Sequence, residues 1–222
     1  QRFDGFGQGD LGRFLRFVES LQEADGDQGE APLLGEGDDV VRVMSIHKSK
    51  GLQFPVVILA DCGKRFNMED VRGRILFEGR CGLGLEWVDP DTGVAYPTLS
   101  QRAVAEALRR ETIAEELRVL YVALTRAQEH LILVGSVNDI GATCARWAGA
   151  VDVSGWPLPE HVLGRAQSYL DWIGPAVMRH RDGEPLRQIA AAEGGRTFTP
   201  QDAHVAADAS RWMIEVHLDA HM

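Results

Sequence analysis

Residues 42–60 read RVMSIHKSKGLQFPVVILA, and residues 116–134 read ELRVLYVALTRAQEHLILV. Each stretch joins a polar, cationic turn or helix end to a run of β-branched and other apolar residues. Apolar runs bounded by turn residues are typical of buried parallel strands, and the loops at the ends of such strands commonly bind phosphate. The two stretches together therefore predict an α/β fold that handles phosphate groups.

The rest of the pattern supports a parallel sheet flanked by helices. Because strand, turn, strand, excursion, long helix and strand follow one another, an α/β sheet is the expected architecture. Strands are predicted at 41–46, 56–59 and 130–134, a small β-excursion at 74–77 and 83–88, and a helix, continuous or broken, at 100–127. Weaker patterns predict helices at 10–24 and 164–180, a loop with a small Ala-rich helix at 181–210, and a strand at 212–218.

Composition narrows the class of protein. The 222 residues carry a formal net charge of −10, which argues against a generic basic nucleic-acid-binding domain. The charge is uneven, because residues 1–39 hold ten acids against three arginines whereas residues 40–80 hold eight bases against four acids. No apolar run has the length of about 20 residues that a bilayer requires. The three cysteines form no CxxC pair, so we expect reduced thiols in a cytoplasmic protein without a metal site.

The first stretch places donors before a glycine. Ser45, His47, Lys48, Ser49 and Lys50 offer hydroxyl, imidazole and ammonium groups, and Gly51 lets the backbone approach a ligand closely. Such a turn suits the phosphate oxygens of a nucleotide or of a nucleic-acid strand. The alternative is a solvated turn without a ligand.

The second stretch ends a strongly apolar helix with Thr125 and Arg126. A guanidinium is always charged and presents a rigid fork of donors, so Arg126 can act as an arginine finger towards the γ-phosphate of a nucleotide. The alternative is a cation that complements the helix dipole. We expect Glu115, Glu116 and Arg118 either to pair on the helix surface or to hold Arg126, and Tyr121 to be a packing residue.

Residues 44–55 resemble motif V of the UvrD/PcrA/RecB-like superfamily 1 DNA helicases, and residues 115–127 resemble motif VI of the same family. Shorter segments are similar to the AddA family, the large subunits of AddAB helicase–nucleases. These segments are Phe66–Met68, Gly82–Gly84, Val88–Pro90, Tyr96–Leu99 and Ser168–Ile173. The resemblance extends over roughly residues 10–180.

The resemblance implies a RecA-like domain, the second of two that bind ATP between them. It assigns Arg126 to the γ-phosphate, Gly51 to the same phosphate and position 53 to the ribose, where the family usually has Glu and this chain has Gln53. It also assigns Ser45, His47 and Lys48 to single-stranded DNA. The implied partners are DNA, the first RecA-like domain of the same polypeptide, and a partner protein of the AddB type.

The sequence contains no Gly-x-x-x-x-Gly-Lys-Ser/Thr loop, no paired-acid box and no match to the nuclease cluster of the AddA family. Together with an opening on Gln1, this predicts a fragment that is inactive alone, with the Mg ligands of the full enzyme outside it. The expected organisation is a helix with an acidic loop (1–39), a RecA-like core (40–150) and a helical extension (151–222). The full protein is expected to act in double-strand break repair and recombination. The alternatives are a non-catalytic helicase-like scaffold module and a small kinase-like nucleotide binder.

Overall fold

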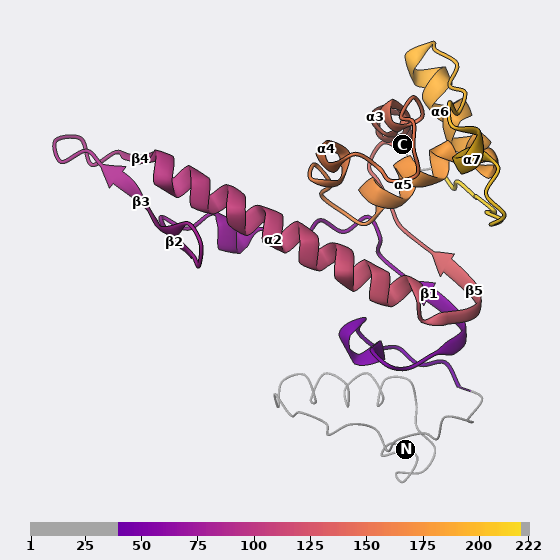
Figure 1. Ribbon diagram of the computed structural model, residues 1–222, viewed down its shortest axis with the longest axis horizontal. Helices are drawn as coiled ribbons and strands as arrows, with labels where there is room; N and C mark the ends of the chain where they lie inside the picture. Colours follow the sequence, from indigo (N-terminus) through magenta and orange to yellow (C-terminus); the bar gives the residue numbers. More distant parts are fainter. Residues whose placement is uncertain (1–39, 219–222) are drawn as a thin grey trace, which may run out of the picture. The chain divides into compact units, whose positions relative to one another are not determined.

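The computed structural model describes residues 40–218, and the predictions for residues 10–24 and 25–39 lie outside this range. The chain divides into two units, residues 1–43 and residues 44–222. The helices and strands of the described residues all lie in the second unit (Figure 1). The described residues contain helices as well as a pair of parallel strands, which confirms the predicted α/β class.

A two-stranded parallel sheet lies beside the predicted site. Strand β1 (Phe54–Leu59) pairs with β5 (Ala127–Leu133), and their register places Val57 opposite Leu131. The ladder continues beyond both strands, because Val134 N donates to Leu59 O and Cys62 N donates to Val134 O, each at 2.9 Å. We predicted buried strands, and for β1 this is wrong: Val56 and Ile58 are exposed, since no further described strand or helix covers that face.

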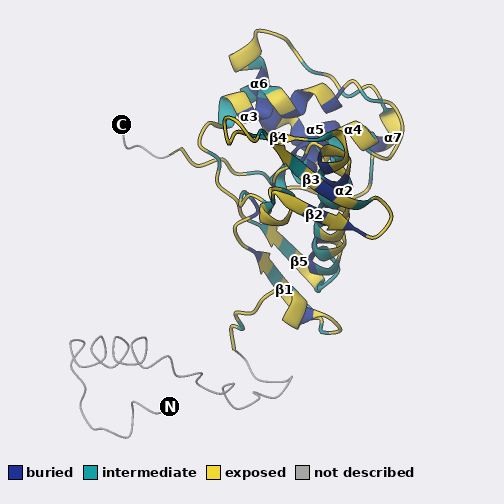
Figure 2. Cartoon of the chain, turned by 90° about the vertical axis from the view of Figure 1, so that its left-hand side faces the viewer, coloured by how far each residue is buried: buried dark blue, intermediate teal, exposed yellow. Residues whose placement is uncertain are grey.

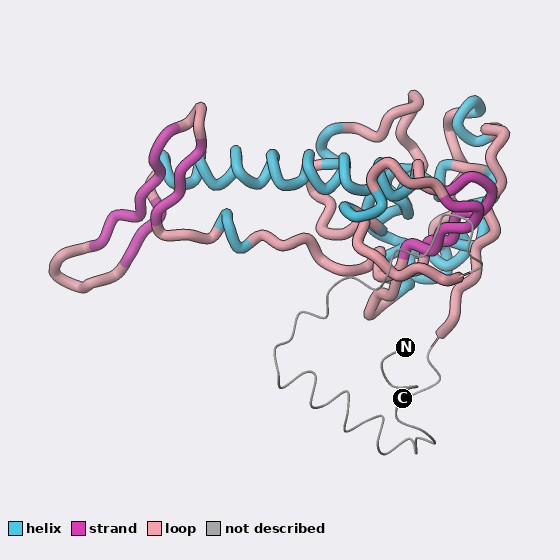
Figure 3. Tube along the Cα trace, turned by 90° about the horizontal axis from the view of Figure 1, so that it is seen from below, coloured by secondary structure: helices cyan, strands magenta, loops and turns pink. Residues whose placement is uncertain are grey.

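Helix α2 (Leu99–Leu124) is continuous over 26 residues. The segment lacks Gly and Pro, and its first turn is capped by Thr98, whose side chain accepts a hydrogen bond from Gln101 N. Its first half packs against strands β2 and β3, and its last turns approach β5. Figure 3 shows the excursion strands at one end of this helix and the parallel pair towards the other.

The predicted β-excursion is a three-stranded antiparallel sheet. It consists of β2 (Ile75–Glu78), β3 (Gly82–Val88) and β4 (Ala95–Pro97), in that order. Glu78 is buried and its carboxylate accepts from Arg80 N at 2.9 Å and Cys81 N at 2.7 Å, so it holds the β2–β3 turn. Gly84 is required by close packing, because a Cβ at this position would lie 2.7 Å from Gln101 Cα of α2.

Short helices form the C-terminal part of the described chain. They are α3 (Ile140–Trp147), α4 (Glu160–Leu163), α5 (Leu170–Arg179), α6 (Glu184–Gly194) and α7 (Ala203–Ala206). The helix predicted at 164–180 therefore begins later, at Leu170. One apolar cluster centres on Trp147 and Met178 within these helices, and another joins Leu59 and Leu120 of the α/β part to Trp172 of α5.

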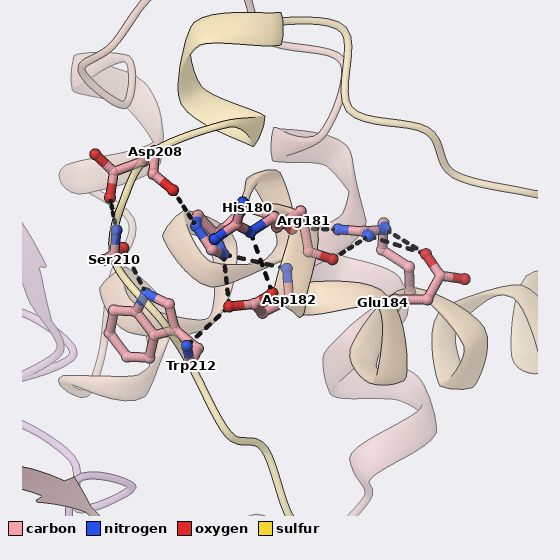
Figure 4. A network of polar contacts seen from close by, with 8 residues as sticks. His180, Arg181, Asp182, Glu184, Asp208, Ser210 and Trp212 are labelled. Carbon is pink, nitrogen blue, oxygen red and sulfur yellow. Dashed lines mark hydrogen bonds and ion pairs between the residues drawn. The ribbon is translucent and has the colours of Figure 1, made fainter.

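Buried polar side chains join α5 to α6 and to the segment after α7 (Figure 4). The Arg187 guanidinium donates to the carbonyls of Met178, His180 and Arg181 and pairs with Glu184 at 2.9 Å. His180 Nδ1 accepts from Asp182 N, so its Nε2 carries the hydrogen and donates to Asp208 O at 3.2 Å. Charged side chains are seldom buried unless their hydrogen-bonding groups are satisfied, and these contacts satisfy them.

Two predicted strands are wrong. Residues 41–45 form no strand, and Val41 and Val43 are almost fully exposed, because no described strand pairs with them. Residues 212–218 also form no strand. Trp212 N instead donates to the Asp182 carboxylate at 2.9 Å, a contact that an alternating pattern cannot reveal.

Among residues 40–218, no helix combines the length and the apolar character needed to cross a bilayer.

Candidate functional site

The turn of the first stretch is a single 3-10 turn, His47–Ser49, that leads into β1. Ser49 is buried and donates from Oγ to Ile46 O at 2.7 Å, so it stabilises the turn. Its hydroxyl hydrogen is therefore not available to a ligand, contrary to the prediction. Ser45 Oγ accepts from Lys48 N at 3.4 Å, which leaves the hydroxyl hydrogen able to be donated. Ser45, His47 and Lys48 are all exposed, as a binding site for a nucleic-acid strand requires.

Gly51 has a positive φ of 85°, a conformation that glycine adopts without a steric penalty. A Cβ built at this position meets no atom within 4 Å, so the space beside the Gly51 backbone is open. The glycine is therefore needed for its backbone conformation, and its surroundings leave room for a ligand to approach.

Arg126 lies just after α2 and immediately before β5, where its half-buried guanidinium is held at three points. Nε donates to Val122 O at 2.7 Å, Nη1 to Leu52 O at 2.9 Å and Nη2 to Thr125 Oγ1 at 2.9 Å. A guanidinium has five N–H hydrogens, so one hydrogen on each Nη has no acceptor among the described residues. These two hydrogens can be directed to an anion supplied from elsewhere.

The two stretches meet at this point. Arg126 O accepts from Phe54 N at 2.9 Å, while its side chain donates to Leu52 O, so Arg126 contacts the residues on both sides of Gln53. We expected the donor turn to follow a strand at 41–46 and so to lie at a carboxyl end. This is wrong, because the turn and Arg126 lie where β1 and β5 begin, at the amino ends of the two strands.

Gln53 is exposed, and its Oε1 accepts from Gln128 Nε2 of β5 at 3.3 Å. The bond orients the Gln53 side chain and leaves its own amide hydrogens available to a hydroxyl. Gln128 was not singled out from the sequence. Its position two residues after Arg126, near the predicted strand at 130–134, is the signal that could have revealed it.

Residues of α2 that the sequence linked to Arg126 do not contact it. Glu115 pairs with Arg118 at 2.8 Å on the exposed surface, and Glu116 accepts from the hydroxyl of Tyr169 at 2.7 Å. Burial, together with this carboxylate, raises the pKa of Tyr169. Tyr121 was expected to pack in the interior, but its side chain is 69% exposed.

Thr125 is the residue that orients Arg126 directly. Its hydroxyl donates to Tyr121 O at 2.9 Å or Val122 O at 3.1 Å, the last carbonyls of α2. Since a hydroxyl has a single hydrogen, the oxygen can only accept from Arg126 Nη2. The signal in the sequence was a threonine at the end of a helix, where such side chains commonly bond to backbone groups.

The described residues contain no cluster of three or more His, Cys, Asp or Glu side chains arranged to hold a metal ion. The exposed Lys48 and the half-buried Arg126 are cationic side chains of the two stretches, and such groups suit an anionic ligand.

Comparison with known proteins identifies the family of this chain. Residues 10–138 match the model of the UvrD-like helicase C-terminal domain. The chain belongs to this family. The UvrD-like C-terminal domain is a RecA-like fold, so the parallel strand pair and the helix that precedes β5 are parts of a RecA-like domain.

Relatives of this UvrD-like domain are named as the A-type subunits of ATP-dependent helicase/nucleases. The protein of Desulforudis audaxviator (strain MP104C) is 50% identical over 207 residues, which cover 93% of this chain and 16% of that protein. The protein of Moorella thermoacetica is 47% identical over 97% of this chain and 15% of its own length, and that of Clostridium novyi (strain NT) is 44% identical over 92% and 16%. The chain thus spans about a sixth of the length of these curated relatives.

Proposed function

We propose that this UvrD-like domain is the second motor domain of an AddA-like, ATP-dependent DNA helicase–nuclease that acts in double-strand break repair and recombination. The proposal rests above all on the half-buried Arg126 guanidinium, which has two N–H groups without an acceptor in the described part of the chain, near the turn that carries Gly51. The names and identities of the relatives support the wider assignment. The proposed partners are DNA, the first RecA-like domain of the same polypeptide, and a partner protein of the AddB type. The proposed location is the cytoplasm.

Three residues are proposed to face the nucleotide. Arg126 binds and stabilises the γ-phosphate, the Gly51 backbone lies against the same phosphate, and Gln53 donates to the ribose. ATP supplies the phosphoanhydride bond whose hydrolysis drives movement, and Mg is proposed to be held by residues outside this chain. A trans-acting arginine typically accelerates phosphoryl transfer by about 10³ to 10⁵.

Ser45, His47 and Lys48 are proposed to contact the phosphates of single-stranded DNA. Their exposure and their place in the basic 40–80 region support this role. Contacts of this kind to phosphates position a nucleic-acid strand without reading its sequence. We further propose that residues 40–150 form the motor core, that 151–222 form its helical extension, and that residues 1–39 belong to a separate subdomain. The isolated chain is proposed to be inactive.

The experiment that tests the proposed function is Arg126→Ala in the full-length parent protein. We expect DNA-stimulated ATPase activity to fall by at least about 10³-fold, with only a modest loss of nucleotide binding. Arg118→Ala is the matched control, because Arg118 lies on α2, close in sequence to Arg126, and pairs with the exposed Glu115. Thermal unfolding of both variants separates loss of chemistry from loss of fold. Near-wild-type turnover in Arg126→Ala would refute the role.

The scaffold alternative makes the opposite prediction. A non-catalytic module requires no charge at position 126, so Arg126→Lys and Arg126→Ala would behave alike in every assay of the parent. If the parent protein itself has no DNA-stimulated ATPase activity, the scaffold interpretation replaces the motor.

A further inference from the structure

One face of the excursion sheet consists only of large apolar side chains. Cross-strand pairing places Ile75 opposite Leu85, Phe77 opposite Leu83, and Trp87 opposite Tyr96. Because side chains alternate along a strand, these six project from the same face, and all are between 42 and 70% exposed. We name this surface the excursion face; Figure 2 shows the strands β2 and β3 with their exposed residues in yellow.

The opposite face of the sheet packs against helix α2. Leu76 and Glu78 are buried, and Gly84 lies directly against α2. An antiparallel sheet that packs one face on a helix normally presents polar residues on the other face. The excursion face departs from this rule, since none of its six side chains carries a charge or an amide.

Contacts within the sheet and with α2 hold the excursion face in a fixed shape. Arg74 pairs with Glu86 at 3.0 Å, and Gln101 Nε2 of α2 donates to Gly73 O at 3.2 Å. The Thr98 hydroxyl donates to Leu85 O at 2.5 Å, which joins the start of α2 to the central strand. The surface is therefore preformed, and little ordering is required when it binds another surface.

The area of the excursion face suggests the kind of occupant. With about 200 Å² for each large side chain, the exposed fractions leave roughly 650 Å² of accessible surface. This exceeds the largest apolar patch on most monomeric proteins, about 300–600 Å². When the partner's side is included, roughly 1,300 Å² would be buried, which lies in the range of about 600–1,500 Å² for interfaces between domains of one chain. Permanent complexes between separate chains bury more, about 2,000–5,000 Å².

We propose that the excursion face docks on an apolar, uncharged surface of another domain of the same polypeptide, outside these 222 residues. The matched segment is only 16% of the Desulforudis protein, so most of the covalently attached chain in such relatives lies elsewhere. A single strand of DNA is a poorer occupant, because the face has aromatic rings but no cation of its own to meet the phosphates. The inference rests on the proposed membership of a longer polypeptide, but not on any activity of Arg126.

The test is site-specific photo-cross-linking in the full-length parent protein. A benzophenone amino acid replaces Phe77, the most exposed aromatic residue of the face, and in a control it replaces Arg110, an exposed polar position on α2. After irradiation, mass spectrometry identifies the cross-linked peptides. We expect position 77 to give at least tenfold more cross-linked product than position 110, mainly with peptides of the same polypeptide outside residues 1–222.

Several outcomes would overturn the proposal. These are a yield at position 77 no higher than at position 110, or cross-links mainly to a different protein, to a second copy, to DNA or to residues within 1–222. Mixing isotopically light and heavy protein distinguishes a second copy from the same chain. The experiment is repeated in the Arg126→Ala background. An unchanged cross-link there, with or without ATPase activity in the parent, keeps the docking result separate from the motor assignment.

Discussion

Thr125→Val tests whether the hydroxyl beside Arg126 matters for turnover. Valine preserves the branched shape but removes the acceptor that residues 40–218 offer to Arg126 Nη2, which lies 2.9 Å away. Hydrogen bonds to charged groups contribute about 1.5–3 kcal/mol, and the half-exposed guanidinium places this bond at or below the lower end. A loss of about 1.4 kcal/mol corresponds to about a tenfold change in rate.

The assay is DNA-stimulated ATP hydrolysis by the full-length parent. We expect kcat to fall about tenfold in Thr125→Val, with KM for ATP changed by less than about threefold, because Thr125 orients the arginine and does not itself bind the nucleotide. Thr125→Ser keeps the hydroxyl and should remain within about twofold of wild type. In the Arg126→Ala background, Thr125→Val should cause no further loss, since the two residues then share one function.

Three results would refute this reasoning: full turnover in Thr125→Val, equal losses in the serine and valine variants, or additive losses in the double variant. A merely structural role predicts the last outcome together with a lower unfolding temperature, so thermal unfolding is measured alongside.

Two further predictions concern the C-terminal helices. Arg187→Met should destabilise the chain by about 3–5 kcal/mol in urea unfolding, because it leaves three carbonyls without their buried donor. Arg118→Met, at an exposed ion pair, should change stability by less than about 1 kcal/mol, and equal losses would contradict the role of the network. The Trp212 backbone N–H, and then the nearby His180 and Arg181, hold the pKa of Asp182 below its usual range. Stability from this carboxylate is therefore present above its unfolded pKa of about 3.9 and is lost as pH falls through the lower folded value. Asp182→Asn should lower the unfolding temperature at pH 7, and the difference from wild type should shrink as the pH falls below about 4; a difference that stays constant on acidification would contradict the assignment.

Local patterns correctly predicted one strand and one long helix. The strand predicted at 56–59 lies within β1, and the segment without Gly or Pro that was predicted as a helix forms α2. The run at 41–46 also contains β-branched residues but forms no strand, because a strand also requires a partner that local sequence does not specify. The same limit explains why 212–218, whose first N–H is bound by Asp182, was wrongly predicted.

The site was predictable in its residue types more than in its geometry. The turn with Gly51 and the arginine at position 126 were both identified, yet their place at the amino ends of the strands was not. The acceptors of Arg126 explain the difference. Leu52 O and Val122 O are backbone groups, and the side chain of Leu52 or Val122 carries no information about such a contact. The excursion face was hidden for a related reason, since Ile75, Leu76 and Phe77 are all apolar and alternation alone cannot tell which side meets α2.

Helix α2 connects the excursion sheet to Arg126. It starts beside Thr98, which is bonded to the excursion sheet, and it ends at Thr125, which is bonded to Arg126. At 1.5 Å per residue its 26 residues form a rod about 39 Å long. If this rod pivots by about 3° at its sheet end, its other end moves by about 2 Å, which is enough to break a hydrogen bond of ordinary length. A domain that binds the excursion face could therefore shift the position of the Arg126 guanidinium through α2.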